Sequence, residues 1–150
     1  MIRRFRADER GAAAVEAALL MPFLLAATVT AADVGKALLD RHLMKTGLAA
    51  GARLLARASD PTTIETQARN LTVMGRPSGG KSRIAGWSPA QVSITYRSVA
   101  NGTGAYLGGP TVRVVRVESS IPYTGFGLVN LIGGGALSVT AVHEERWTGG

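Results

Sequence analysis

Residues 12–32 form an almost wholly apolar run, AAAVEAALLMPFLLAATVTAA, that contains a single charged residue, Glu16. At a rise of ~1.5 Å per residue, a helix of this length matches the ~30 Å hydrocarbon layer of a bilayer. The run is therefore predicted to be a transmembrane helix. Pro22 lies inside it, where the ring removes a backbone N–H and crowds the preceding turn, so we expect a kink there.

The segment before this run is rich in arginine. It contains Arg3, Arg4, Arg6 and Arg10, and Gly11 stands at the junction. A basic segment followed by an apolar one is also typical of a secretory signal peptide. Glu16 argues against that interpretation, because a carboxylate inside an inserting segment costs ~2.5–3.5 kcal/mol. A charge within the membrane indicates instead a functional group with a specific partner.

A cut between Gly11 and Ala12 would supply such a partner. It would create a free α-amine on Ala12, one helical turn before Glu16. Amine and carboxylate could pair within one helix or between neighbouring helices. Because a buried charge without its partner is costly, such a pair can fix the register of packed helices.

These residues also carry a family resemblance. Gly11 followed by AAAVEAALLMP, with a basic leader before it, is similar to the start of type IV pilin-like proteins. More specifically, residues 10–19 and Pro22 resemble the TadE/TadG-like minor pseudopilins of tight-adherence (Tad/Flp) pili. The resemblance continues through DVGKALL at residues 33–39 and AAGAR at residues 49–53. Ala17 stands where an aromatic residue is frequent in that family.

The resemblance implies that residues 1–11 are a leader, cleaved after Gly11 by a membrane prepilin peptidase. It implies a bacterial inner-membrane protein with a cytoplasmic N-terminus and a C-terminal domain that is periplasmic, or extracellular in the pilus. The leader arginines favour this orientation, although Lys36, Arg41 and Lys45 lie within counting range on the other side. The implied partners are other pilins and pseudopilins, the pilus assembly platform and membrane lipid, and the implied role is pilus assembly in adhesion.

The helical pattern continues beyond the membrane over residues 33–58, and a continuous helix from residue 12 would extend ~70 Å. Two apolar stripes follow its helical spacing, one formed by Leu39, Leu43, Gly47, Ala50 and Leu54 and the other by Met44, Leu48, Ala52 and Leu55. We expect one stripe to pack on the globular domain and the other on a partner subunit. Gly47 and Gly51 are four residues apart and would permit close approach of another helix.

Residues 59–150 are predicted to form a small α+β domain. A short helix is expected from Pro61 to near Gly75, then a loop to residue 90, then antiparallel strands over residues 91–99, 111–118 and 136–147. With the long N-terminal helix, this gives a three-stranded sheet beside helices. The apolar, glycine-rich stretch 121–135 is too short to span a membrane, and both a place in the core and an exposed patch for a partner remain open.

Composition narrows the function classes. The chain carries a net charge of +7 and no cysteine. Absence of cysteine excludes a disulfide framework, a thiolate zinc site and a cysteine nucleophile. Beyond the leader, the basic residues are spread along the chain without a recognition motif, so we expect no nucleic-acid binding and interpret them as a solvated basic surface.

Residues 75–82, GRPSGGKS, satisfy the phosphate-binding pattern G-x-x-x-x-G-K-[ST]. That loop needs a buried strand before it and a helix that opens at the lysine, here Lys81. Gly86 and Pro89 leave little room for such a helix, and no aspartate follows Asp60 to hold magnesium. A nucleotide-binding enzyme is therefore a weak alternative.

No other constellation of catalytic residues can be assembled. His42 and His143 have no ligand partners at metal spacing, and Glu144-Glu145 is interpreted as a solvated strand end. We expect no enzymatic activity, no cofactor and no metal. The main alternative to the pseudopilin hypothesis is an uncleaved single-pass membrane protein whose outer domain binds a partner in the envelope.

Overall fold

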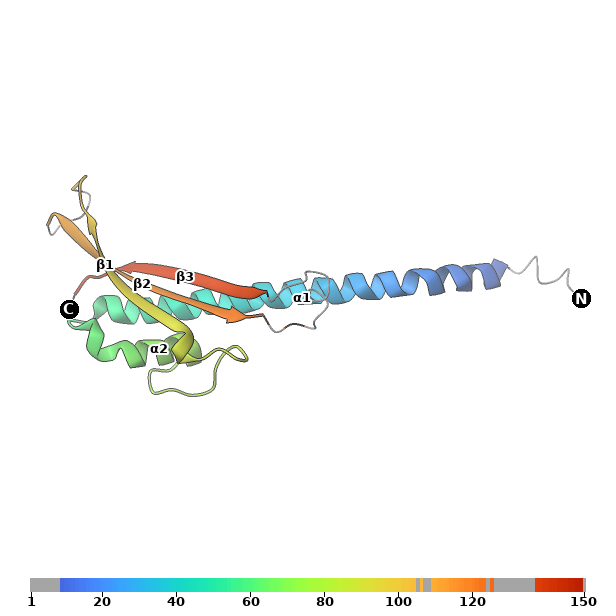
Figure 1. The fold of residues 1–150 in the computed structure, drawn as a ribbon, viewed down its shortest axis with the longest axis horizontal. Helices are drawn as coiled ribbons and strands as arrows, with labels where there is room; N and C mark the ends of the chain where they lie inside the picture. The colour runs from blue at the N-terminus through green and yellow to red at the C-terminus, as the bar shows by residue number, and fades with distance from the viewer. Residues whose placement is uncertain (1–8, 105, 107–108, 124, 126–136, 150) are drawn as a thin grey trace, which may run out of the picture. The chain divides into compact units, whose positions relative to one another are not determined.

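The computed structural model describes residues 9–104, 106, 109–123, 125 and 137–149. The helices are α1 (Glu9–Arg57) and α2 (Glu65–Met74), with short 3-10 turns η2 (Pro61–Ile64) and η3 (Pro89–Gln91). The strands are β1 (Val92–Ala100), β2 (Thr111–Pro122) and β3 (Ser138–Arg146) (Figure 1). The chain divides within α1 into two compact units: the first reaches Lys36 and the second begins at Ala37.

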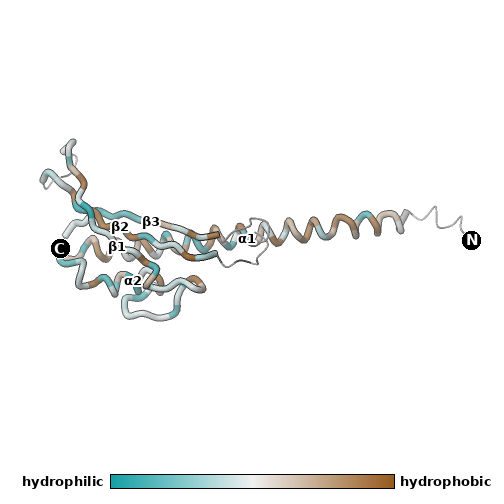
Figure 2. Tube along the Cα trace, in the orientation of Figure 1, coloured by the Kyte–Doolittle hydropathy of each residue, from teal (hydrophilic) through white to brown (hydrophobic). Residues whose placement is uncertain are grey.

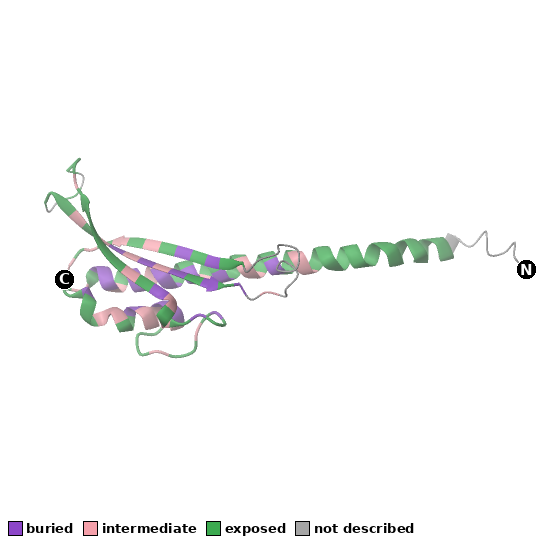
Figure 3. Cartoon of the chain, in the orientation of Figure 1, coloured by how far each residue is buried: buried purple, intermediate pink, exposed green. Residues whose placement is uncertain are grey.

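In the first unit the described chain is helical from residue 9 to Lys36, which confirms the helix predicted over residues 12–32. Its colours in Figure 2 are mostly those of apolar residues, and every residue from Gly11 to Thr28 is exposed (Figure 3). The hydroxyls of Thr28 and Thr30 donate to the carbonyls one turn before them, at 2.8 Å each. Pro22 lies inside the helix, and the kink expected there stays a prediction.

The second unit contains the predicted antiparallel sheet, in the order β1-β2-β3. Val92 pairs with Ser119 across the first ladder, and Val114 pairs with Arg146 across the second. β2 is longer than the segment 111–118 predicted for it, because β3 pairs with it as far as Pro122. Alternation along the strands buries one face of the sheet, including Val115, Val117, Val139 and Ala141.

The second half of α1 supplies the other side of this core. Met44, Leu48, Ala52 and Leu55 are all fully buried. In the predicted stripe that begins at Leu39, by contrast, Leu39 is 57% exposed and Leu43 only half-buried. The stripe that begins at Met44 is therefore the more deeply buried one, and Leu43, Gly47 and Leu54 of the other stripe also border the core.

Gly47 and Gly51 bring α1 and α2 together. A Cβ at Gly47 would collide with the Thr72 carbonyl oxygen and lie 3.1 Å from Trp87 Cη2. A Cβ at Gly51 would collide with the Thr72 hydroxyl and lie 3.1 Å from the Ala68 carbonyl oxygen. The predicted close approach is confirmed, and the helix that approaches is α2 of the same chain.

Local signals set both ends of the α2 region. Asp60 accepts hydrogen bonds from the Thr62 hydroxyl at 2.6 Å and the Thr62 amide at 3.0 Å, and these bonds hold the pKa of Asp60 below its ordinary value. Gly75 ends α2 with φ 76° and donates its N–H to the Leu71 carbonyl at 2.9 Å. The predicted helix from Pro61 to near Gly75 is thus confirmed, with a 3-10 first turn.

The apolar stretch 121–135 lies mostly outside the described residues. Ile121 and Tyr123, which begin it, are buried. The choice between core and partner surface for the rest of the stretch stays open.

Candidate functional site

The four residues singled out in the N-terminal segment, Gly11, Ala12, Glu16 and Pro22, all lie in the first unit, on α1, and all are exposed. Ala12 and Glu16 are one turn apart on the same side of the helix. A Cβ at Gly11 would meet nothing within 4 Å. Nothing in the described packing therefore requires a glycine at this position.

Around Glu16 the helix presents large apolar side chains to its surroundings. Their exposed fractions range from 52% for Leu20 to 74% for Phe23. The others are Val15, Leu19, Met21, Leu24 and Leu25. A helix that is apolar all round is one that lipid or other helices must cover. It is the one described helix long and apolar enough to cross a membrane, and it is consistent with membrane anchoring.

The phosphate-loop pattern at residues 75–82 does not have the geometry of a nucleotide site. Gly75 caps a helix, whereas the loop needs a strand before it. Lys81 opens no helix, and the chain instead turns back so that the Arg83 amide donates to the Val73 carbonyl at 3.0 Å. The segment is a surface connection between α2 and η3.

The two histidines do not gather metal ligands. His42 is exposed on α1, and His143 Nε2 lies 3.1 Å from Glu145 Oε2. Within the part of the chain that the structure describes, no three His, Asp or Glu side chains are placed to hold a metal ion.

A charged network that sequence reasoning missed crosses the solvent face of the sheet. Arg97 and Arg116 both bind Glu144, at 2.5 and 3.0 Å, and Arg116 also binds Glu118 at 2.7 Å. The two guanidinium groups lower the pKa of Glu144, and the carboxylates raise the pKa of Arg116. Glu144 is exposed, as expected for a solvated strand end. Its ion pairs also link β3 to β1 and β2. Opposite charges two positions apart on β2 (Arg116 and Glu118) and on β3 (Glu144 and Arg146) are the signal that could have revealed the network.

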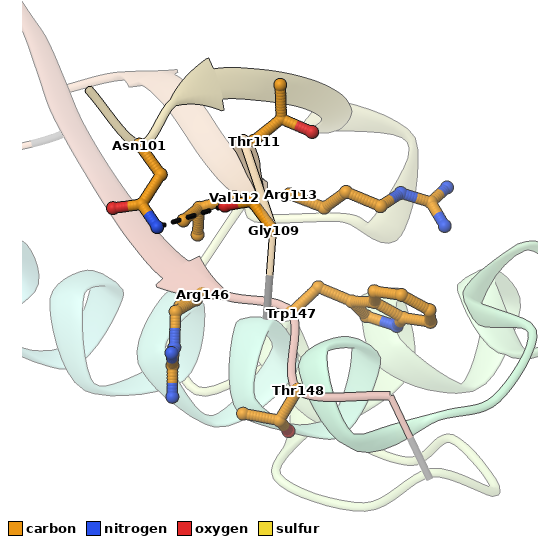
Figure 4. Close-up of a pocket in the computed structure, with 8 residues that line it drawn as sticks. All are labelled: Asn101, Gly109, Thr111, Val112, Arg113, Arg146, Trp147 and Thr148. Atoms are coloured by element: carbon orange, nitrogen blue, oxygen red, sulfur yellow. Dashed lines mark hydrogen bonds between the residues drawn. The ribbon is translucent and has the colours of Figure 1, made fainter. Parts of the chain in front are cut away.

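A second feature lies where β2 and β3 reach the C-terminal end of α1. A recess of about 290 Å³ is lined there by residues that include Asn101, Thr111, Arg113, Arg146, Trp147 and Thr148 (Figure 4). Trp147 anchors the strand end to the helix end, because its Nε1 donates to the Ala58 carbonyl at 2.9 Å. These residues come from separate parts of the sequence, so no local motif announces the recess.

The described chain is thus an α+β protein with one apolar N-terminal helix suited to a membrane. Residues 11–53 match the TadE-like protein family, so the chain carries a TadE-like domain, and the resemblance predicted from the sequence is confirmed. This is a pilin-type structural family not known for catalysis, and the match implies association with Tad pilus components. Neither the curated proteins nor the solved structures include a match to this chain.

Proposed function

We propose that the protein is a minor pseudopilin of a Tad/Flp-type pilus. It is made as a precursor with a leader at residues 1–11, cut between Gly11 and Ala12, and held in the inner membrane by residues 12–32. The observation that carries this proposal is that the family match begins at Gly11 itself and runs through the exposed apolar helix. The domain over residues 59–150, together with the helix of residues 33–58, then lies on the periplasmic side or in the pilus.

The surroundings of Gly11 support cleavage there. A glycine in an exposed helix destabilises it by ~0.5–1 kcal/mol relative to alanine, and the described chain offers no packing reason to keep it. Without a side chain, its backbone is open to close approach by the catalytic site of a prepilin peptidase.

Glu16 is proposed to set the register of assembly. Its carboxylate is exposed on a helix whose neighbouring side chains are apolar. Once lipid covers that helix, an unpaired carboxylate is costly, so the group needs a positive partner. The new α-amine of Ala12 on an adjacent pilin or pseudopilin supplies one, and assembly on the pilus platform brings such helices together in a pilus that serves adhesion.

The processing step is tested by mass spectrometry of the protein extracted from membranes of cells with an active prepilin peptidase. The first residue should be Ala12, and an intact Met1–Arg10 leader would contradict the proposal. Gly11→Val should block cleavage. Gly35→Val is the matched control, because a Cβ at Gly35 also meets nothing within 4 Å, and it should leave cleavage unchanged.

The assembly step is tested with Glu16→Ala. This variant should be cleaved normally and should support far fewer pili than the unaltered protein. Normal piliation in Glu16→Ala would remove the register role while leaving the processing claim intact. A precursor that is never cut in any variant would favour the alternative, a single-pass membrane protein with an envelope-facing binding domain.

A further inference from the structure

Two groups of arginines in the second unit differ in how many carboxylates neutralise their charge. On the solvent face of the sheet, Arg97 and Arg116 have carboxylate partners within 3.0 Å. Near the C-terminal end of α1, four other arginines line two recesses, and Glu145 is the one carboxylate among the described lining residues. We propose that this surface, which we call the arginine end and define by Arg53, Arg57, Arg113 and Arg146, binds a short acidic segment of a partner protein.

Two adjoining recesses shape the arginine end. The first, of about 290 Å³, has Arg113 and Arg146 in its wall and no carboxylate among its lining residues. The second, of about 180 Å³, is lined by Arg53, Arg57 and Arg146 together with Glu145. Arg146 therefore contributes to both. Arg53 lies 3.9 Å from Glu145, which is too long for a strong ion pair, so the surface keeps most of its positive charge.

The guanidinium groups of Arg113 and Arg146 each lie over an aromatic ring. The guanidinium carbon of Arg113 lies 4.5 Å from the centre of the Trp147 ring, and that of Arg146 lies 5.1 Å from the centre of the Tyr106 ring. Stacking of this kind fixes the guanidinium plane and leaves its N–H edge able to donate to an oxygen. An acidic ligand would then meet donors that are already oriented, which lowers the entropy cost of binding.

Hydrogen bonds hold the two aromatic residues. Trp147 donates its backbone N–H to the Arg113 carbonyl at 2.9 Å and its indole N–H to Ala58. Asn101 donates to the Tyr106 carbonyl at 2.7 Å and accepts from the Tyr106 amide at 3.3 Å. Hydrogen bonds thus hold the indole of Trp147 and the backbone of Tyr106, the two residues over whose rings the guanidinium groups lie.

The geometry also selects the kind of ligand. In Figure 4 the side chains of Arg113 and Arg146 extend in different directions from the strand ends, so one carboxylate cannot bind both. The ligand therefore needs at least two acidic groups. Each aromatic ring carries a guanidinium on one face, so that face is not available for stacking bases or sugars. These features favour an acidic peptide over a nucleic acid or a polysaccharide.

The test uses the full chain in detergent micelles and a fluorescein-labelled peptide of eight glutamates, with an eight-glutamine peptide as the neutral comparison. Binding is followed by fluorescence anisotropy at an ionic strength of ~0.15 M, where diffuse surface attraction is largely screened. The unaltered protein should bind the glutamate peptide and not the glutamine peptide. Arg113→Gln/Arg146→Gln should weaken binding by about tenfold or more, because two charge-assisted contacts are lost.

The matched control is Arg76→Gln/Lys81→Gln, which removes the same charge from two exposed residues of the loop after α2. It should change the affinity by less than about twofold. Equal losses in the two double variants would overturn the proposal, since they would show attraction to overall charge. Arg113→Lys/Arg146→Lys keeps the charge and provides a second test should the glutamine variant not fold. It should also weaken binding, because lysine lacks the planar guanidinium group with its fixed set of N–H donors.

Three further outcomes would overturn the proposal. They are no preference for the glutamate peptide, unchanged binding in the lysine variant, and tighter binding of a thymidine oligonucleotide or an anionic polysaccharide than of the glutamate peptide. The inference is independent of the processing proposed above. Precursor and cleaved chains should bind equally, because all four arginines lie beyond residue 52.

Discussion

The two halves of α1 both carry large apolar side chains but differ in burial. From Gly11 to Thr28 every residue is exposed, including Phe23 at 74%. From Met44 to Ala56 one stripe of the same helix is fully covered by α2, the sheet and the chain between them. The chain thus completes the core around one half of its longest helix and leaves the other half to be covered by lipid or by other proteins.

The sequence differs between the two halves in a way that explains this contrast. The first half is apolar on all sides, apart from Glu16. In the second half, charged residues such as Lys45 and Arg53 occupy the face away from the core, and two glycines stand where α2 approaches. A broad apolar surface indicates a membrane segment, whereas a stripe with a charged reverse face indicates a helix on a core. Four pairs of substitutions test this comparison.

The largest difference is expected from leucine truncations. Leu48→Ala should lower the free energy of unfolding of the second unit by ~2–5 kcal/mol, because it leaves a cavity at a fully buried position. Leu24→Ala, at a residue that is 62% exposed, should change it by less than ~0.5 kcal/mol. Both are measured by denaturant unfolding in detergent micelles, with the fluorescence of Trp87 and Trp147 as the readout. Equal effects would contradict the division of the helix.

Glycine-to-alanine substitutions should change stability in opposite directions in the two halves of α1. Gly47→Ala places a methyl group against the Thr72 carbonyl and should destabilise the second unit by ~1–3 kcal/mol. Gly35→Ala meets nothing within 4 Å and should raise helix stability by up to ~1 kcal/mol. Unfolding curves report the first effect, and the helical signal in circular dichroism reports the second. A stabilising Gly47→Ala would refute the close approach of α1 and α2.

A hydroxyl in each region makes the same bond to the carbonyl one turn earlier. Thr72→Val removes a buried bond of 2.8 Å to Ala68 and should cost ~1 kcal/mol. Thr28→Val removes an exposed bond of the same length to Leu24 and should be within ~0.5 kcal/mol of neutral. The same unfolding measurement separates them. A larger cost at Thr28 would mean that another molecule buries this position in the micelle.

The smallest effect on stability is expected from a fall in pH. Because the pKa of Glu144 is lowered in the folded protein, its carboxylate contributes fully above the pKa of an unfolded glutamate. That contribution is lost as the pH falls through the lowered value, so the melting temperature of the second unit should decline in acid. Glu144→Gln should flatten this decline, whereas Glu16→Gln, outside the network, should not. An unchanged acid profile in Glu144→Gln would show that the network adds no stability.

The elements of the fold were largely predictable because local chemistry sets them. Period-3.6 spacing identified α1 to Arg57, and Pro61 and Gly75 marked the limits of the next helical segment. The length of β2 was less accurate, because its end depends on pairing with β3 and not on its own residues. The choice between two apolar stripes on α1 could not be made from spacing alone, since both satisfy the same period.

The candidate sites divide in the same way. Gly11, Ala12, Glu16 and Pro22 could be singled out from the sequence, because the hypotheses about them rest on their positions within one apolar run. The network around Glu144 and the arginine end could not, because they join distant segments. Arg97 and Glu144 are 47 positions apart, and Trp147 and Ala58 are 89 apart.

The sequence by itself determined the apolar helix, its single carboxylate, the strand and helix segments and the family to which residues 11–53 are matched. These properties follow from local spacing and from transfer of side chains between water and an apolar medium. Tertiary structure alone decided which face of α1 is covered and which arginines find carboxylates. Those outcomes depend on strand register and on where the end of β3 meets the end of α1, and contacts between distant segments set both.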